Sequence, residues 1–361
     1  MSTVHNFNAG PAVLPADVLR KAQNELLDYR GLGYSIMEAS HRSKEFDAVI
    51  SHAETNFRSL LGLGSDYAVL FLQGGASLQF AMLAQNLMGS GGSADYVDTG
   101  SWSSKAMKEA KLFGDVRTAA SSKASNYDHI PPAANWDLDP NARYLHITTN
   151  NTIMGTQFAT MPKAPEGVPL VGDMSSDILS RPFDASAFGL IYAGAQKNLG
   201  PSGVTLAILR RDLAERCPAN VPTMLRYDTH MDNGSMYNTP PTFGIYILGL
   251  VTDWVISHGG LDGLQKMNEA KAALIYDCID ADDFYRCPAR LDSRSRMNIC
   301  FRLPSEELEA MFLKEAEAAG MVGLKGHRAV GGLRASIYNA SPKESAQALA
   351  DLMTQFRAAH G

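Results

Sequence analysis

Hydrophobic residues in the first part of the chain recur at helical spacing. The first predicted helix covers about residues 16–29, after Pro15, and its apolar face comprises Val18, Leu19, Ala22, Leu26 and Leu27. The second covers about residues 43–61, and its apolar face comprises Phe46, Val49, Ile50, Ala53, Phe57 and Leu60. Because residues three and four positions apart share one side of a helix, each segment should bury that side against a core.

The pattern then changes to short apolar runs without polar alternation. These runs cover residues 67–72, 144–148, 168–171, 189–193 and 204–209, and glycine-rich turns and helical stretches separate them. Such runs are typical of strands that are covered on both faces. The sequence therefore predicts an α/β domain built around a mostly parallel central sheet flanked by helices.

The last hundred residues predict a second, smaller domain. A helix over 243–257 ends at Gly259 and Gly260, and another helix follows to about residue 279. We place the boundary there, with a large domain over 1–258 and a small one over 259–361. Within the small domain, strands over 297–303 and 333–338 and helices over 305–319 and 342–358 predict an α+β fold. Residues 89–93 and 121–135 read as surface loops.

Composition narrows the class of protein. The chain has 361 residues, which suggests about two domains, and its 45% hydrophobic and 19% charged residues are those of an ordinary globular protein. Its net charge of -6 argues against a nucleic-acid partner, whose recognition needs a basic surface. The four cysteines have no metal-binding or disulfide-scaffold spacing, so we expect reduced thiols and no metal. No signal peptide or membrane span is recognisable, and we expect a cytoplasmic protein.

Two charged residues follow apolar runs at comparable positions. Asp173 follows the run that includes Val171, and Lys197 follows the run 189–193. In open α/β sheets the carboxyl ends of the strands line the ligand crevice, so both side chains can reach one site. Either residue alone would more often be a solvated loop residue. Their combination with an anion-binding turn carries more weight.

That turn is Gln73-Gly74-Gly75-Ala76-Ser77, between a predicted strand and a helical pattern. Glycines let the backbone approach an anion, and the first N–H groups of a helix can bind phosphate oxygens. Trp102, before another helix, could stack on a planar ligand, although in isolation such a residue is more often a core or rim aromatic. An amine, a carboxylate, an indole and a phosphate cradle together predict pyridoxal 5'-phosphate as cofactor.

At this point the sequence resembles the phosphoserine aminotransferase family, a class V family of fold-type I pyridoxal-phosphate enzymes. The resemblance extends over essentially the whole chain. It is carried by the strings at residues 6–12 (NFNAGPA), 40–42 (SHR), 192–198 (YAGAQKN), 233–241 (NGSMYNTPP), 325–328 (KGHR) and 331–339 (GGLRASIYN).

The resemblance implies a role for each cofactor residue. It implies that Lys197 forms a Schiff base with the cofactor, that Asp173 pairs with its ring nitrogen and that Trp102 stacks on the ring. The residues implied near the ring and its phosphate are Ala76, Ser77, Thr152 and Gln196, with Asn238 and Thr239 from the partner subunit of a homodimer. Ser77 departs from relatives that have an arginine at this position, so one possible phosphate-binding charge is missing.

The resemblance also implies how substrates bind. His41, Arg42, His327 and Arg328 would surround the substrate's phosphate or distal carboxylate, and Arg334 would bind the α-carboxylate. The implied reaction is a ping-pong transamination in serine biosynthesis, in which glutamate and 3-phosphohydroxypyruvate give 2-oxoglutarate and phosphoserine. The family also suggests activity on 4-phosphohydroxythreonine, in pyridoxine biosynthesis.

Three alternatives stay open at this point. A cysteine desulfurase would need an exposed, activated thiol, and neither Cys287 nor Cys300 lies in a sequence context that predicts one. An alanine:glyoxylate aminotransferase would not need a pocket with two His-Arg pairs, His41-Arg42 and His327-Arg328. A noncatalytic protein that binds pyridoxal phosphate would not need Lys197, Asp173 and Trp102 together, and bleaching of the yellow cofactor by glutamate would distinguish it from an enzyme.

Overall fold

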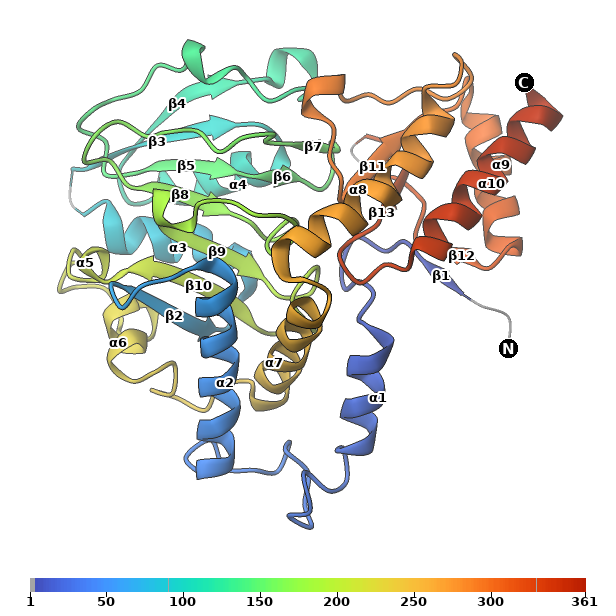
Figure 1. Ribbon diagram of the computed structural model, residues 1–361. Coiled ribbons are helices and arrows are strands. Elements are labelled where there is room, and N and C mark those ends of the chain that lie inside the picture. The colour runs from blue at the N-terminus through green and yellow to red at the C-terminus, as the bar shows by residue number, and fades with distance from the viewer. Residues whose placement is uncertain (1–3, 90, 329) are drawn as a thin grey trace.

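A seven-stranded sheet forms the centre of the computed structural model, which describes residues 4–89, 91–328 and 330–361 (Figure 1). Six of its strands run parallel to one another and β10 runs opposite. From edge to edge the order is β2 (Tyr67–Leu72), β10 (Thr205–Arg210), β9 (Phe188–Gly194), β8 (Leu170–Asp173), β5 (Leu145–Thr148), β3 (Ser93–Asp98) and β4 (Asp115–Ser121). The prediction of a mostly parallel sheet is confirmed.

Both faces of this sheet are covered by helices. Along β2, Val69 and Phe71 belong to one buried cluster and Leu70 and Leu72 to another. The first cluster includes side chains of α2 (Lys44–Leu61) and α7 (Thr242–Ser257), and the second includes side chains of α3 (Gly75–Leu87) and α4 (Ser101–Ala110). Burial on both sides explains why the strands read as continuous apolar runs.

Helix α2 has clear signals at both ends. The Ser43 side chain accepts a hydrogen bond from the backbone N–H of Phe46, and Gly62 ends the helix in a left-handed conformation, at φ 63°. Val49, Ile50, Ala53 and Phe57 are among its buried side chains, as predicted. Leu60 is only half-buried, whereas Leu61 is buried.

The first helix is shorter than the spacing of its leucines predicts. Helix α1 (Ala16–Asn24) buries Val18 and Ala22, but Leu27 lies beyond it and is 86% exposed. The chain reverses direction at Arg30, where φ is 54°, and the N–H of Tyr29 bonds to the carbonyl of Tyr34 instead of continuing the helix. The turn that buries Tyr29 therefore overrides the local helical pattern.

A smaller unit with its own core lies beside the sheet (Figure 1). Its elements are α8 (Gly260–Ile279), β11 (Asn298–Phe301), α9 (Glu306–Ala318), β12 (Met321–Val322), β13 (Leu333–Ser336) and α10 (Lys343–His360). Strand β1 (His5–Asn6) pairs in parallel with β12, and Phe7 is fully buried in the same core. The N-terminal strand thus packs with the small unit, although we assigned residues 1–258 to the large domain from the sequence.

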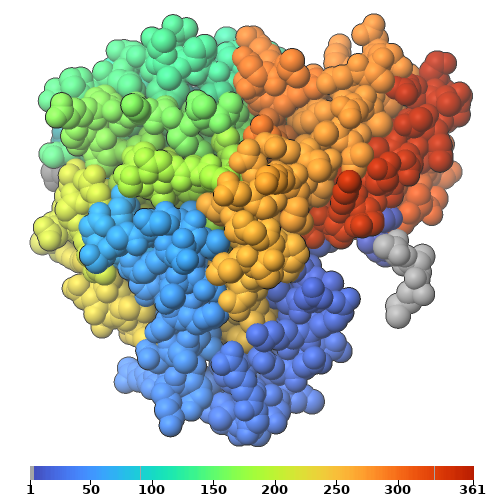
Figure 2. Space-filling view, viewed as in Figure 1, coloured from blue at the N-terminus to red at the C-terminus, as the bar shows by residue number. Residues whose placement is uncertain are grey.

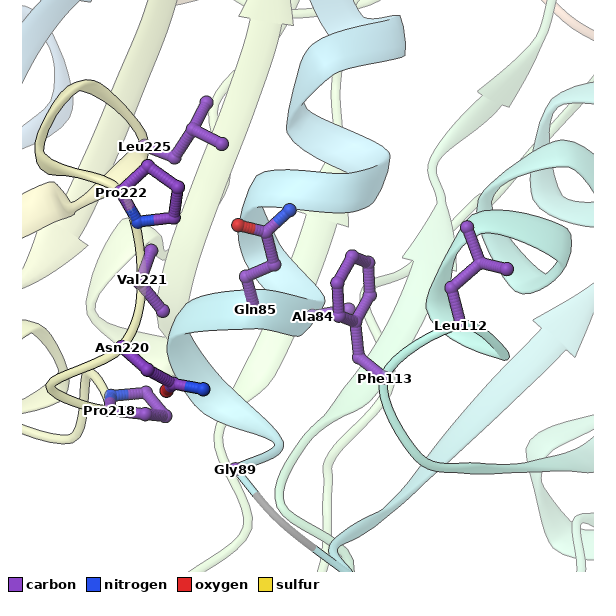
Figure 3. A pocket seen from close by; sticks show the side chains of 10 residues that line it. All are labelled: Ala84, Gln85, Gly89, Leu112, Phe113, Pro218, Asn220, Val221, Pro222 and Leu225. Carbon is purple, nitrogen blue, oxygen red and sulfur yellow. The ribbon is translucent and has the colours of Figure 1, made fainter.

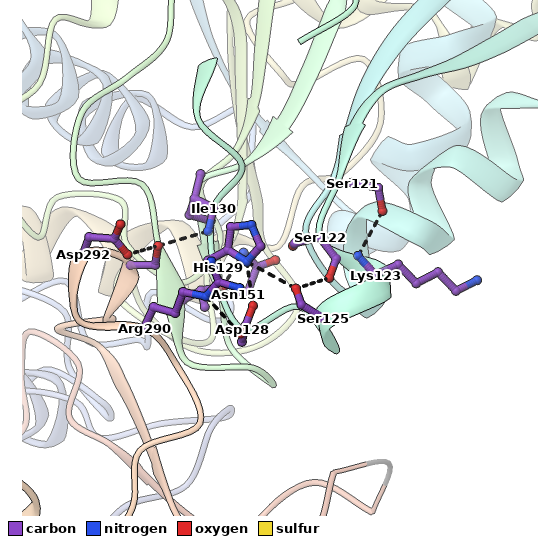
Figure 4. A network of polar contacts seen from close by, with 12 residues as sticks. Ser121, Ser122, Lys123, Ser125, Asp128, His129, Ile130, Asn151, Arg290 and Asp292 are labelled. Atoms are coloured by element: carbon purple, nitrogen blue, oxygen red, sulfur yellow. Dashed lines mark hydrogen bonds and ion pairs between the residues drawn. The ribbon is translucent and has the colours of Figure 1, made fainter. Parts of the chain in front are cut away.

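The two units share buried and polar contacts. Helix α8 places Leu264 in the core of the sheet and Ile275 in that of the small unit, and it lies between the two on the face shown in Figure 2. Two hydrogen bonds also join loops of the two units. Nε of Arg290 donates to Asp128 at 3.0 Å, and the N–H of Ile130 donates to Ser293 at 3.1 Å (Figure 4). The boundary after residue 258 stays a prediction.

The remaining elements are short. They are β6 (Asn150–Asn151), β7 (Thr156–Gln157), α5 (Arg211–Ala214), α6 (Tyr227–Asp232) and the 3-10 helices Lys123–Ser125, Ala133–Asn135, Ala185–Ala187, Thr223–Leu225 and Leu291–Ser293. Two of these 3-10 helices interrupt the loop predicted over 121–135. No helix among the described residues is long and apolar enough to cross a membrane.

Candidate active site

Lys197 and Asp173 follow neighbouring strands of the sheet. Strand β8 ends at Asp173, and β9 ends at Gly194, three residues before Lys197. These strands pair in parallel with Asp173 opposite Tyr192, so their carboxyl ends lie at the same edge of the sheet. This is the edge at which open α/β sheets bind ligands.

The amine of Lys197 is held by a single described hydrogen bond. Its Nζ donates to the hydroxyl oxygen of Thr152 at 2.9 Å. Burial lowers the pKa of Lys197 to about 8, while the carboxylate of Asp173 opposes this shift and the charge of Arg334 adds to it. Near neutral pH an appreciable fraction of the side chain is therefore the neutral amine, which is the nucleophilic form.

The carboxylate of Asp173 is buried and bonded on one oxygen. Ser175 donates to Oδ1 twice, from its backbone N–H at 3.0 Å and from its hydroxyl at 2.7 Å. Burial raises the pKa of Asp173, and the two bonds from Ser175 oppose that rise. No described hydrogen bond reaches Oδ2. This oxygen can accept a proton donor from a ligand, and a cationic ring nitrogen would favour the carboxylate form.

Trp102 lies in the first turn of α4, which is fixed by a buried carboxylate. The hydroxyls of Ser103 and Ser104 donate to Oδ1 of Asp98 at 2.9 and 2.8 Å. The Trp102 ring centroid is 5.8 Å from Nζ of Lys197. The indole therefore lies beside the amine, where it can stack on a planar ligand bound to that amine.

The glycine turn forms a cradle at the start of α3. Gly74 has φ 86°, and a Cβ there would lie 2.5 Å from Cδ2 of Leu78, so the turn requires glycine. Helix geometry leaves the N–H groups of Gly75, Ala76 and Ser77 without partners inside the helix. Nothing lies within 4 Å of a Cβ placed on Gly75. The turn thus offers N–H donors and open space to an anion.

The N-terminal segment lies against the lysine. The carbonyl of Gln196 accepts a hydrogen bond from the N–H of Ala12 at 2.9 Å. A Cβ on Gly10 would lie 3.4 Å from Cγ of Lys197, so a larger side chain there would press on the lysine stem. The segment 10–12 therefore packs against both Gln196 and Lys197.

Three predicted substrate residues, His327, Arg328 and Arg334, form a group near the lysine. We call it the cationic group because of its two arginines. Nη1 of Arg334 donates to the backbone carbonyl of Thr152 at 3.3 Å, and its buried Nε has no described partner. Burial lowers the pKa of His327, and the charges of Arg334, Arg328 and Lys105 lower it further. Thr152 thus contacts both Lys197 and Arg334, which joins the amine to the cationic group.

The remaining predicted residues, which we call the second group, are His41, Arg42, Asn238 and Thr239. Nδ1 of His41 lies 3.4 Å from the hydroxyl of Thr239, and Nε2 of Gln73 donates to the carbonyl of Thr239 at 3.3 Å. Arg42 and Asn238 are the sequence neighbours of His41 and Thr239, and both are exposed. In the described part of the chain, no hydrogen bond, ion pair or ring contact joins this group to Lys197, Asp173 or Trp102.

Two supporting residues were not anticipated from the sequence. Ser175 fixes the carboxylate of Asp173, and the hydroxyl of Thr149 donates to the backbone carbonyl of Asp173 at 3.1 Å. The Asp-x-Ser spacing could have indicated Ser175, because an Asp side chain often accepts from the N–H two residues later. Thr149 depends on the pairing of β5 with β8, and the sequence gives no comparable local signal for it.

Other features do not provide a competing site. A cavity of about 420 Å³ lies at the end of α3, and none of the predicted site residues lines it (Figure 3). Burial raises the pKa of Cys300 to about 12, and burial also raises the pKa of Cys287. Neither thiol is therefore activated as a desulfurase nucleophile requires. Within the described ranges, no group of three His, Cys, Asp or Glu residues could hold a metal ion.

Comparison with known proteins identifies the family. The family model for aminotransferase class-V matches residues 4–349. Phosphoserine aminotransferase from Niallia circulans is 58% identical over 358 residues, covering 99% of each chain, and that from Herpetosiphon aurantiacus is 56% identical, covering 99% of this chain and 100% of the relative.

Solved structures give the same result. A phosphoserine aminotransferase from Bacillus circulans subsp. alkalophilus has a TM-score of 0.98 at 57% identity, covering 99% of each chain. A pyridoxal-phosphate-bound phosphoserine aminotransferase from Trichomonas vaginalis has a TM-score of 0.92 at 36% identity, covering 98% of this chain and 100% of that one. This chain therefore belongs to the class V aminotransferases and, within them, to the pyridoxal-phosphate-dependent phosphoserine aminotransferases.

Proposed function

We propose that Lys197 is the residue that binds pyridoxal phosphate and transfers the proton in the reaction of this family, the exchange of an amino group between glutamate and 3-phosphohydroxypyruvate. The observation that carries this assignment is the amine itself. It is half-buried and bonded to Thr152, and burial lowers its pKa to about 8. When bound, the cofactor supplies an electrophilic carbon and an electron sink. Lys197 then holds and returns the proton at the substrate Cα.

The other predicted cofactor residues of this chain would position the cofactor. Asp173 would accept the ring N–H through its unbonded Oδ2 and, by its charge, keep that nitrogen protonated. Trp102, beside Nζ of Lys197, would cover one face of the ring and exclude water from it. The N–H groups of Ala76 and Ser77 would bind the phosphate, with Gln196 beside them. The N–H groups and the dipole of α3 would then supply part of the phosphate binding that an arginine at position 77 could provide.

The cationic group would bind the substrates. Arg334, whose buried Nε has no hydrogen-bond partner among the described residues, would bind the α-carboxylate that glutamate and phosphoserine share. His327 and Arg328 would face the distal anion, which is a carboxylate in one substrate and a phosphate in the other. One pocket could then serve both halves of a ping-pong reaction that yields 2-oxoglutarate and phosphoserine.

The second group would be supplied to the active site of a partner subunit. His41 contacts Thr239, so a loop that carries Thr239 across an interface would carry His41 and Arg42 with it. Loop residues 233–241 contain Asn, Gly and Pro, and Gly234 and Ser235 have positive φ, which suits a projecting turn. A homodimer with shared sites would follow. Activity on 4-phosphohydroxythreonine and a cytoplasmic location stay predictions.

Borohydride reduction of the purified holoenzyme followed by peptide mapping tests the central assignment. The reduced cofactor should label Lys197 alone, and Lys197→Ala should lose both the label and turnover. The matched control is the peptide that contains Lys271, which is also a buried lysine. This peptide should stay unlabelled, because no described contact joins Lys271 to the cofactor residues. A label on any lysine other than Lys197 would overturn the proposal.

A further inference from the structure

One exposed lysine lies next to the cofactor-stacking residue. Lys105 is three residues after Trp102 on α4, so both side chains lie on one side of the helix. Nζ of Lys105 is 4.3 Å from the centroid of the Trp102 ring, and Nζ of Lys197 is 5.8 Å from the same centroid. The side-chain nitrogens of two lysines from separate segments therefore lie near one indole.

The charge of Lys105 also reaches the substrate-binding group. It contributes, with Arg334 and Arg328, to the lowered pKa of His327, whose largest cause is burial. Among the described residues, no carboxylate forms an ion pair with Lys105, Arg328 or Arg334. The protein thus gathers these cations without a described counter-ion, and an anionic ligand would relieve their mutual repulsion.

Lys108 provides a contrast one turn further along α4. It is exposed like Lys105, but it has no described contact with Trp102 and is not among the charges that shift the pKa of His327. Of these two exposed lysines, only Lys105 therefore both contacts Trp102 and acts on the pKa of His327.

We propose that Lys105 is a specificity-determining residue, whose ammonium group favours substrates with a phosphate dianion over those with a carboxylate monoanion. This inference rests on the proposed role of His327 and Arg328 at the distal anion. A fixed charge interacts about twice as strongly with a dianion as with a monoanion at the same place. If removal of Lys105 lowers the rate with a monoanion by some factor, the rate with a dianion should fall by about the square of that factor.

The size of the effect follows from the exposure of Lys105. An exposed ion pair changes an equilibrium by a factor of roughly 1.5 to 5, so we expect Lys105→Met to lower kcat/KM about threefold for glutamate and about tenfold for phosphoserine. Both half-reactions can be followed by the absorbance of the bound cofactor. Because the two constants are compared in one protein sample, any loss of folded enzyme cancels in their ratio.

Three further variants complete the test. Lys108→Met should keep the wild-type ratio, and Lys105→Arg should restore it, since the charge is retained. An unchanged ratio in Lys105→Met, or an equal change in Lys108→Met, would overturn the proposal. Arg328→Met separates this from the underlying assignment. If that variant also leaves the ratio unchanged, the distal-anion site itself is wrong, and if only Lys105→Met is silent, the error concerns Lys105.

Discussion

The side-chain oxygen of Asn198 accepts a hydrogen bond from the backbone N–H of Asn339 at 3.0 Å. Asn198 follows Lys197 directly, and Asn339 lies in the turn between β13 and α10, so the bond ties the lysine loop to the small unit. The amide of Asn198 also donates to the carbonyl of Ser176, in the loop after Asp173, at 3.1 Å. One buried side chain therefore connects the loops at Asp173 and Lys197 with the small unit.

Replacing this residue should damage stability and turnover together. Asn198→Ala would leave the N–H of Asn339 and the carbonyl of Ser176 without partners, each costing about 1 to 3 kcal/mol. We expect a lower Tm and a lower kcat, with substrate KM changed less because the cationic group is not touched. Thermal unfolding of the holoenzyme and steady-state kinetics provide the two measurements. An unchanged Tm would show that this connection contributes little.

Cofactor loading should depend on pH through the amine of Lys197. The neutral amine is the reactive form, and burial lowers its pKa to about 8 from 10.5. The rate at which the apoenzyme binds pyridoxal phosphate should therefore rise with pH and level off above about pH 8 to 9. Stopped-flow absorbance from pH 6.5 to 10 measures this directly. A rate that is still rising at pH 10 would indicate an ordinary, solvent-exposed lysine.

Removing the charge of Asp173 should reduce activity far more than cofactor affinity. Asp173→Asn keeps an oxygen that can accept from Ser175, but it no longer stabilises a protonated ring nitrogen. We expect kcat to fall at least about a hundredfold, an effect of about 2.7 kcal/mol or more on the barrier, while phosphate contacts keep the cofactor bound. Kinetics and cofactor titration give the two values. Near-normal turnover would remove Asp173 from its role.

The buried amine of Lys271 should stabilise the small unit. Its Nζ lies within 2.7 to 3.2 Å of the carbonyls of Ile337, Tyr338, Asn339 and Ser341. Lys271→Met would leave these acceptors without this donor, so we expect a loss of roughly 2 kcal/mol or more. Denaturant unfolding of the wild type and the variant measures it.

The loss should also depend on pH. Burial lowers the pKa of Lys271 to about 7 from 10.5, so between these values the unfolded chain binds a proton that the folded chain releases. The free energy of unfolding that this group contributes therefore rises with pH in this window. The difference between wild type and Lys271→Met should be larger at pH 9.5 than at pH 7. A smaller difference at pH 9.5 would contradict the assigned direction of the shift.

Shared active sites predict recovery of activity on mixing inactive variants. Lys197→Ala lacks the amine, and a variant with both Asn238→Ala and Thr239→Ala should lack phosphate contacts across the interface. Random exchange makes half of the dimers mixed, and each mixed dimer has one intact site, so activity should return to about a quarter of the wild-type value. Native mass spectrometry establishes that exchange has occurred. No recovery after exchange would show that each site is built from one chain.

Local patterns predicted the features that depend on local physics. The buried apolar runs predicted strands such as β2 and β9, and the polar residues at their ends led to Asp173 and Lys197. The end of α1 could not be predicted in this way, because the buried ring of Tyr29 packs edge-on against Tyr246, which is far away in the sequence. The same holds for the contact between His41 and Thr239, whose loops lie almost two hundred positions apart, and for β1, which has only two residues.

The pairing of β1 with β12 also bears on how the enzyme is made. His5 is synthesised 316 residues before its partner Met321. At about 5 to 20 residues per second, the first strand waits roughly 15 to 60 seconds for its partner. The segment around Gly10 that lies against Lys197 cannot be anchored at both ends before then. The large unit can therefore fold on the ribosome first, whereas the finished active site is a late event in biogenesis.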